Sequence, residues 1–338
     1  MLTFTGKLVP SNTLYTVDLA YTDAAHGHNV VANSFAAPID ITQFRDTDFV
    51  NAEKTIYIFN TGSRAQAEAV DFANGNGAGQ YTAISIGTVD EMTTFFGSNP
   101  SIASTIAPMQ GFCVNATGAG AKLKFDYNKL VWNANYATHQ PQAMRAPRRA
   151  KAVADENEQP IPAAMKISME TKGWSDEVYM LESERYAFEY EDGYDAHKLE
   201  SGNFNVFTVR DGEQLAIDAT PDFEGTQIGV RTGDATAYTL HFSNLYGERY
   251  WTLVDTEADQ TIEINEGTMY TFFMEPNNVN VGRFYLIERE ENAPTVTTGV
   301  EPTSDSSLKG ISKKFVKDNQ LYILKNGVLY DATGARVR

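Results

Sequence analysis

The stretch Ala237-Tyr-Thr-Leu-His-Phe-Ser243 decides the fold of this chain. Its apolar residues Tyr238, Leu240 and Phe242 alternate with polar ones. Because successive side chains of a β-strand point to opposite faces, this period of two predicts a strand with one buried face. The same period recurs at residues 261–265, 269–274 and 284–286.

Turn signals separate these strands at intervals typical of an antiparallel sandwich. They include Asp211-Gly212, Gly233-Asp234 and Glu266-Gly267. No helical period is long enough to supply the crossovers between parallel strands, which argues against Rossmann and TIM-barrel folds.

The first part of the chain also predicts short strands, separated by Gly, Asn and Pro. Short helices are expected only at Asp90–Phe96 and Gln43–Val50. The expected strands are 14–21, 30–31, 55–59, 81–86, 111–114 and 121–125.

A linker divides the chain, because residues 139–163 contain four prolines and no aromatic residue. Such a segment buries too little apolar surface to offset the entropy lost on ordering. We therefore predict an all-β protein with two antiparallel β-sandwich domains, of the jelly-roll or immunoglobulin-like type, and a short C-terminal hairpin tail. The predicted divisions are residues 1–138 (first sandwich), 139–163 (linker), 164–292 (second sandwich), 293–307 (linker) and 308–338 (tail).

The tail is predicted from Asn326-Gly327, which lies between two apolar runs. A tight hairpin turn needs positive φ at both central residues, and Asn-Gly adopts it readily. The tail is basic, whereas residues 155–305 carry 31 acidic and 9 basic side chains. An acidic body argues against nucleic acid or anionic lipid as a partner.

The composition and the N-terminal residues bear on the cellular compartment of the protein. The single cysteine, Cys113, excludes an intrachain disulfide, and no apolar run reaches the ~20 residues of a spanning helix. Residues 1–6 read as a strand rather than a signal peptide. The chain is therefore either cytosolic or has lost a signal peptide or a larger upstream region.

Short strings in both halves carry a resemblance to a known group. In the first half they are residues 4–6, 27–41, 56–60 and 106–114. In the second they include Trp251-Thr-Leu-Val-Asp255, Tyr270-Thr-Phe272 and Arg283-Phe284-Tyr-Leu286, besides residues 188–195, 198–199 and 238–240. These strings resemble a module pair near the C-termini of exported Bacteroidetes surface proteins, including type IX secretion cargo. Ser34 and Cys113 depart from that pattern, which usually has Pro and an aromatic residue there.

This resemblance implies an extracellular or outer-surface protein whose upstream region is absent from the chain. It favours a non-enzymatic module with a structural or adhesive role, and glycans or extracellular proteins as partners. Two alternatives stay open: a carbohydrate-binding module, and an accessory region of a larger enzyme.

Two groups of residues raise the question of a metal site. His26 and His28, with Asp23 nearby, share the spacing of two ligands on one strand face, but a third ligand is not evident. Clustered carboxylates suit Ca²⁺, and Glu189, Glu191, Asp192 and Asp195 surround Gly193 without the spacing of an EF-hand. A turn and a solvated acidic loop are the simpler interpretations.

Catalytic motifs are missing from the sequence. There is no nucleophile elbow, phosphate loop or zinc-protease motif, and Gly75, Gly77 and Gly79 precede no predicted helix. Cys113 lies in an alternating strand, where cysteine packs as a small hydrophobe. We therefore predict no catalytic, cofactor-binding or metal-binding residues and no cofactor.

Four aromatic residues are the candidates for stacking on sugar rings: Trp174, Tyr246, Tyr250 and Trp251. Aromatic residues on sandwich strands usually belong to the core, where they bury a large area. Exposure of two of them would favour the carbohydrate-binding alternative.

Overall fold

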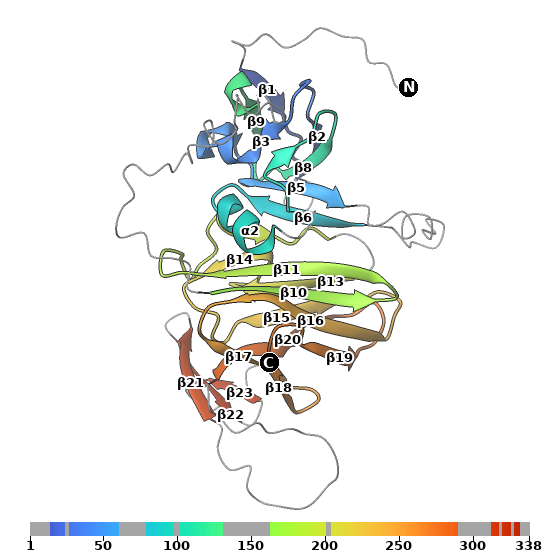
Figure 1. Ribbon diagram of the computed structural model, residues 1–338, viewed down its shortest axis with the longest axis vertical. Helices are drawn as coiled ribbons and strands as arrows, with labels where there is room; N and C mark the ends of the chain where they lie inside the picture. The colour runs from blue at the N-terminus through green and yellow to red at the C-terminus, as the bar shows by residue number, and fades with distance from the viewer. Residues whose placement is uncertain are drawn as a thin grey trace, which may run out of the picture. The chain divides into compact units, whose positions relative to one another are not determined.

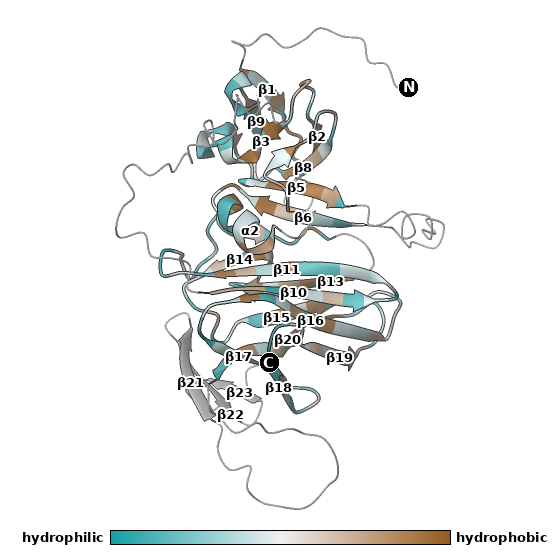
Figure 2. Ribbon diagram, in the orientation of Figure 1, coloured by the Kyte–Doolittle hydropathy of each residue, from teal (hydrophilic) through white to brown (hydrophobic). Residues whose placement is uncertain are grey.

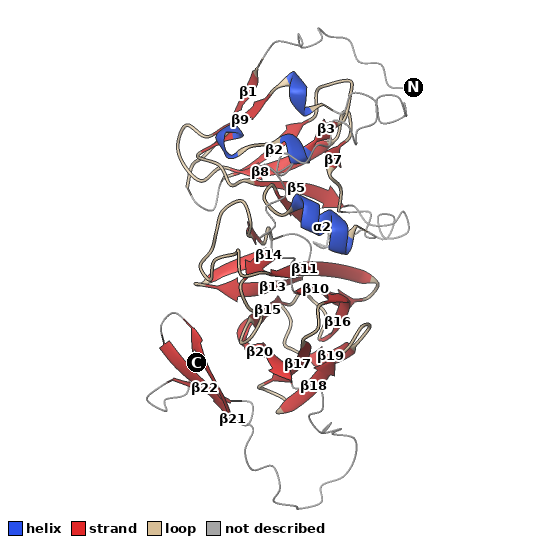
Figure 3. Cartoon of the chain, turned by 60° about the vertical axis from the view of Figure 1, so that its left-hand side comes forward, coloured by secondary structure: helices blue, strands red, loops and turns tan. Residues whose placement is uncertain are grey.

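The computed structural model describes residues 14–23, 27–60, 79–97, 102–130, 163–200, 204–289, 312–317, 320–325 and 328–331. Strands dominate these ranges, which confirms the all-β fold class (Figure 3). Hydrophobic and hydrophilic residues mix along most strands, as one-sided burial requires (Figure 2). No helix within the described ranges has the length and apolar content of a membrane-spanning helix.

The chain forms two compact units. The first contains residues 1–69, 78–160 and 191–199, and the second contains residues 70–77, 161–190 and 200–338. The short segment 191–199 thus belongs to the first unit although its neighbours in sequence belong to the second. The domain boundaries inferred from the sequence stay a prediction.

The first unit consists of three small sheets with the strand orders β1-β9-β4, β2-β8-β5-β6 and β3-β7. Their apolar faces enclose one core, which includes Ile39, Ile56, Ile84, Val114 and Leu123. The strands of these sheets are β1 (Tyr15–Asp18), β2 (His28–Ala32), β3 (Ile39–Asp40), β4 (Phe49–Val50), β5 (Thr55–Asn60), β6 (Gln80–Ser85), β7 (Thr105–Ile106), β8 (Gly111–Asn115) and β9 (Lys122–Phe125). The segment 191–199 contains the short strand β12 (Ala196–His197), which belongs to none of these three sheets.

The predicted helix at Asp90–Phe96 is confirmed as α2 (Val89–Phe96). The helix expected at Gln43–Val50 is wrong, because the chain forms two 3-10 turns, η1 (Ile41–Gln43) and η2 (Asp46–Asp48), and then enters β4. The Asp48 carboxylate accepts a hydrogen bond from the Arg45 N–H at 2.7 Å. Such a local side-chain bond competes with continued helix. A third 3-10 turn, η4, covers Tyr127–Lys129.

The second unit contains one large sheet with the strand order β18-β17-β20-β15-β13-β14-β11-β10-β16-β19. Neighbours are antiparallel except β11 and β14, which run parallel. The strands are β10 (Ala163–Thr171), β11 (Trp174–Glu182), β13 (Asn205–Arg210), β14 (Glu213–Thr220), β15 (Gln227–Arg231), β16 (Ala237–Tyr246), β17 (Tyr250–Asp255), β18 (Gln260–Ile264), β19 (Met269–Phe273) and β20 (Val279–Arg289).

One core lies inside this sheet. It contains residues from strands near both ends of the order, among them Leu253 of β17, Ile264 of β18 and Phe272 of β19. It also contains Met165 and Phe242 from the middle strands β10 and β16. The sheet therefore curls into a nearly closed layer around a single apolar interior, with β10 and β11 in a different layer from β17 and β18 (Figure 1).

The alternation at residues 237–243 is confirmed in β16, where Tyr238, Leu240 and Phe242 are buried and the intervening residues are partly buried. The predicted hairpin is confirmed as well. β22 (Gln320–Lys325) pairs antiparallel with β23 (Val328–Asp331). The Asn326-Gly327 turn itself lies outside the described residues. β21 (Ser312–Lys317) adds a third strand to this small sheet.

Candidate functional site

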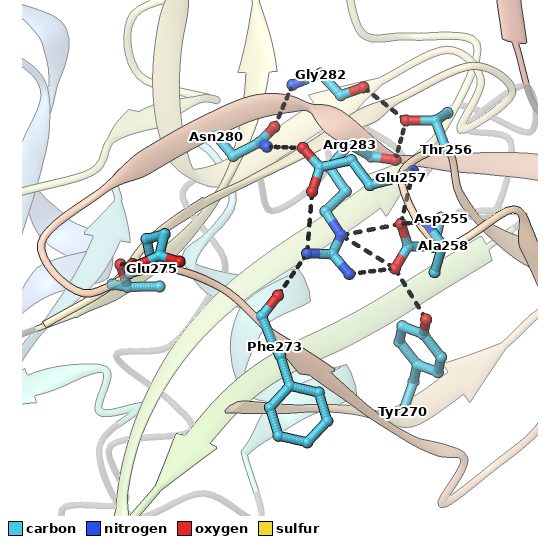
Figure 4. Close-up of polar contacts among 11 residues, drawn as sticks. Asp255, Thr256, Glu257, Ala258, Tyr270, Phe273, Glu275, Asn280, Gly282 and Arg283 are labelled. Carbon is cyan, nitrogen blue, oxygen red and sulfur yellow. Dashed lines mark hydrogen bonds and ion pairs between the residues drawn. The ribbon is translucent and has the colours of Figure 1, made fainter. Parts of the chain in front are cut away.

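Asp255, Tyr270 and Arg283 form a polar cluster in which the side chains of Asp255 and Arg283 are buried. Arg283 donates from Nε to the two Asp255 oxygens at 2.9 and 3.0 Å, and from Nη2 to Oδ2 at 2.7 Å. The Tyr270 hydroxyl donates to the same Oδ2 at 2.8 Å. Figure 4 shows the three side chains converging from β17, β20 and β19. We call these three residues the Arg283 cluster.

The remaining polar atoms of the cluster also have partners. Asp255 Oδ1 accepts hydrogen bonds from the N–H groups of Glu257 and Ala258, both at 3.0 Å. Arg283 Nη1 donates to the Phe273 carbonyl at 2.8 Å and lies 3.2 Å from a Glu257 carboxylate oxygen. Neighbouring protein groups thus satisfy the hydrogen-bonding atoms of both Asp255 and Arg283.

The position of the cluster explains its role in the fold. Tyr270 and Phe273 belong to β19, the last strand at one end of the sheet order. Asp255 and Arg283 belong to β17 and β20, near the other end. Among the described strands, β19 does not pair with β17 or β20, so the hydrogen bonds of the cluster join the two ends of the sheet order. The cluster therefore acts as a latch on the curled sheet.

The pKa shifts of Asp255 and Tyr270 are those expected of a structural cluster. Burial would raise the pKa of Asp255, but hydrogen bonds from Arg283, the Ala258 N–H and Tyr270 outweigh it and hold the pKa below its ordinary value. Burial and the bond to Asp255 raise the pKa of Tyr270 to about 12. A carboxylate whose pKa is lowered, beside a phenol whose pKa is raised to about 12, is unsuited to proton transfer near neutral pH.

A second cluster surrounds Arg249, which bonds three carboxylates. Its Nη1 lies 2.7 Å from Glu182, and its Nη2 lies 2.9 Å from Asp222 and 2.8 Å from Glu288. The guanidinium also covers the Trp251 ring at 4.5 Å. Burial raises the pKa of Glu182, although Arg249 opposes this. The three carboxylates therefore form ion pairs with the Arg249 guanidinium, and the charges of this cluster are compensated by protein groups.

The structure describes one of the two histidines that are candidates for a metal site. His28 is exposed on β2, and His26 lies outside the described residues. Within the described ranges, no three His, Cys, Asp or Glu side chains are placed to share a metal ion.

The acidic segment around Gly193 does not form one cluster. Asp192 accepts a hydrogen bond from the Lys54 N–H at 2.8 Å, and Asp195 accepts one from the Glu191 N–H at 2.8 Å. Burial raises the pKa of Asp192. Glu189 is exposed. The two aspartates therefore act as acceptors for backbone donors.

Cys113 is buried on β8, as its alternating context predicts. Burial raises the pKa of its thiol to about 11, and the nearby Glu53 carboxylate adds to the rise. A thiol that keeps its proton is a weak nucleophile.

The aromatic candidates divide between core and surface. Trp251 is buried and Trp174 packs against the same core. Tyr246 and Tyr250 are exposed by 46% and 37% at the ends of β16 and β17. Arg289 covers the Tyr250 ring at 5.2 Å. Of Gly75, Gly77 and Gly79, which precede no predicted helix, the structure describes Gly79, and this glycine precedes the strand β6.

Sequence reasoning did not identify the Arg283 cluster as a site, although the signal was present. Asp255, Tyr270 and Arg283 each lie in one of the short strings that carry the family resemblance. The structure shows that these three separate strings supply the members of one buried cluster.

Comparison with known proteins gives one informative similarity. The chain is 25% identical over 256 residues to a minor fimbrium subunit, Mfa5, of Porphyromonas gingivalis. The match covers 73% of this chain but only 20% of the length of that relative. No protein-family model and no solved structure matches the chain.

Proposed function

We propose that this chain is a non-enzymatic structural module of an exported, cell-surface protein. The main support for this proposal is the similarity to a fimbrium subunit, which extends over 73% of the chain. A match over 256 residues is longer than any one local motif.

The polar clusters support a structural role. Buried charges are tolerated where they are paired and hydrogen-bonded, and such pairs fix one arrangement of a fold. The buried Asp255 and Arg283 side chains are saturated by protein groups. An acid–base site would instead need a group with a pKa near the working pH and within reach of substrate.

We further propose that the chain is a C-terminal part of a longer exported protein, in the manner of type IX secretion cargo, with the two sandwich domains as its paired modules. On this proposal its partners are extracellular proteins at the cell surface. A basic tail after an acidic body is consistent with a separate role for the tail.

Deletion of the gene in the source organism tests the structural and adhesive role. We expect reduced adherence or an altered surface layer, restored by the intact gene, with unchanged growth in defined medium. A growth defect that a single metabolite rescues, with normal adherence, would argue for an enzyme instead.

Carbohydrate binding is a second candidate because Tyr246 and Tyr250 are both exposed, although Arg289 covers one face of the Tyr250 ring. Tyrosine rings at a surface can stack on sugar rings, since they present a large flat apolar face. A glycan array probed with the purified chain should then give hits that the Tyr246→Ala and Tyr250→Ala variants lose. An array without hits removes this candidate.

A further inference from the structure

The segment 191–199 makes a series of specific contacts with the rest of the first unit. Asp192 Oδ1 accepts a hydrogen bond from the Lys54 N–H at 2.8 Å, and the Lys54 ammonium lies 3.7 Å from Asp192 Oδ2. The carbonyl of Gly193 accepts a hydrogen bond from the Gly87 N–H at 2.7 Å. These bonds hold the first half of the segment.

The second half is held by a buried carboxylate. Glu53, only 1% exposed, accepts hydrogen bonds at Oε1 from the His197 N–H at 3.0 Å and from the Tyr57 hydroxyl at 2.7 Å. The same Tyr57 hydroxyl lies 3.0 Å from the His197 carbonyl. Glu53 thus bonds the backbone N–H of His197, and the Tyr57 hydroxyl lies within hydrogen-bonding distance of the carbonyl of the same residue.

The glycines at this contact show how closely the two backbones approach. A Cβ on Gly87 would lie 2.4 Å from the Gly193 carbonyl oxygen and 3.1 Å from the Tyr194 ring. Gly193 has φ of +101°, a conformation that residues with a Cβ rarely adopt. The three heavy atoms nearest to a Cβ placed on Gly87 all belong to the segment 191–199. The contact is therefore fitted for this peptide.

We propose that residues 191–199 are a docked peptide segment, and that Glu53, Lys54, Tyr57 and Gly87 form its binding surface on the first unit. The first unit is then completed by a piece of chain encoded after residue 163. It follows that a cut between residues 131 and 162 severs the chain without releasing the first unit.

A cleavable form of the full chain tests this. A specific protease sequence is inserted between Ala150 and Lys151, and the cleaved protein is followed by size-exclusion chromatography and by sedimentation over a range of concentrations. We expect the two fragments to migrate together and to separate only on dilution.

The decisive variant is Gly87→Ala. Its new Cβ meets only the docked segment, and Gly87 has no positive φ, so the first unit keeps its own backbone geometry. We expect the dissociation constant of the fragments to rise about tenfold or more, because each lost buried hydrogen bond weakens binding severalfold. Asp192→Asn should act in the same direction.

Matched controls are Gly118→Ala, where the nearest atom to the new Cβ is 3.5 Å away, and Glu189→Gln, an exposed acid outside the segment. Neither should change the dissociation constant. Separation of the unsubstituted fragments at every concentration would overturn the proposal. So would Gly87→Ala and Asp192→Asn fragments that bind as tightly as the unsubstituted ones, since other contacts would then hold the pieces together.

Discussion

Substitution of Asp255 by Asn is the sharpest test of the latch on the second unit. Asp255 is 0% exposed and Arg283 is 6% exposed. Among the described residues, the substitution leaves the buried guanidinium with the Glu257 carboxylate, 3.2 Å away and 55% exposed, as its charged partner. Removing one partner of a buried pair costs about 3–5 kcal/mol. Because Glu257 compensates in part, we expect a loss of about 3 kcal/mol.

Urea unfolding followed by tryptophan fluorescence measures this loss, since Trp251 is buried in the core of the second unit and Trp174 packs against the same core. With a denaturant slope of about 2–3 kcal/mol/M, the midpoint should fall by about 1 M. The control Glu257→Gln removes an exposed charge and should cost under about 1 kcal/mol. Adding Arg283→Met to Asp255→Asn should restore part of the stability, because it removes the unpaired buried charge. A loss below about 0.5 kcal/mol, or purely additive losses in the double variant, would refute this reasoning.

The same pair has a pH signature. The pKa of Asp255 is lower in the folded protein than its value of about 3.9 in the unfolded chain. Its contribution to stability is therefore present above about pH 4 and is lost as the pH falls through the folded pKa. The Asp255→Asn variant should lack this component of the acid unfolding curve. Equal acid sensitivity of the two proteins would contradict the assignment.

Three further predictions concern single side chains. The pKa of Tyr270, raised to about 12, adds stability that is present below about pH 10 and is lost as the pH rises through 12, so Tyr270→Phe should remove this part of the alkaline unfolding curve. Cys113 should react with a thiol reagent at pH 8 only after unfolding, and rapid reaction of the folded protein would contradict its burial and raised pKa. Gly229→Ala should cost about 1–3 kcal/mol in urea unfolding, because its Cβ would lie 2.1 Å from the buried Phe207 ring, whereas Gly282→Ala, with 3.9 Å of clearance, should cost much less.

Local features of this fold could be predicted from the sequence. The alternation at residues 237–243 predicts β16 because its period is set within a few residues. The Asn326-Gly327 pair predicts a hairpin for the same reason, and β22 and β23 flank it. The segment Gln43–Val50 misled because its spacing suits a helix while Asp48 closes a tighter local turn.

Long-range pairings could not be predicted in this way. Asp255 and Arg283 meet because β17 and β20 are neighbours in the sheet, and alternation within a strand says nothing about its neighbour. With 44 acidic side chains, the sequence offers many partners for each arginine. Glu53 and His197 are 144 positions apart, and no local pattern links them. The short strings that carry the family resemblance contain Asp255, Tyr270 and Arg283, so they were the available sequence indication of the Arg283 cluster.

The location of the protein tests the central claim most directly. Antibodies raised against the purified chain can be applied to intact cells of the source organism, followed by gold labelling and electron microscopy. The account predicts gold particles on the outer surface that disappear after protease treatment of intact cells. Labelling that requires cell lysis, with the protein found only in the cytoplasmic fraction, would contradict it.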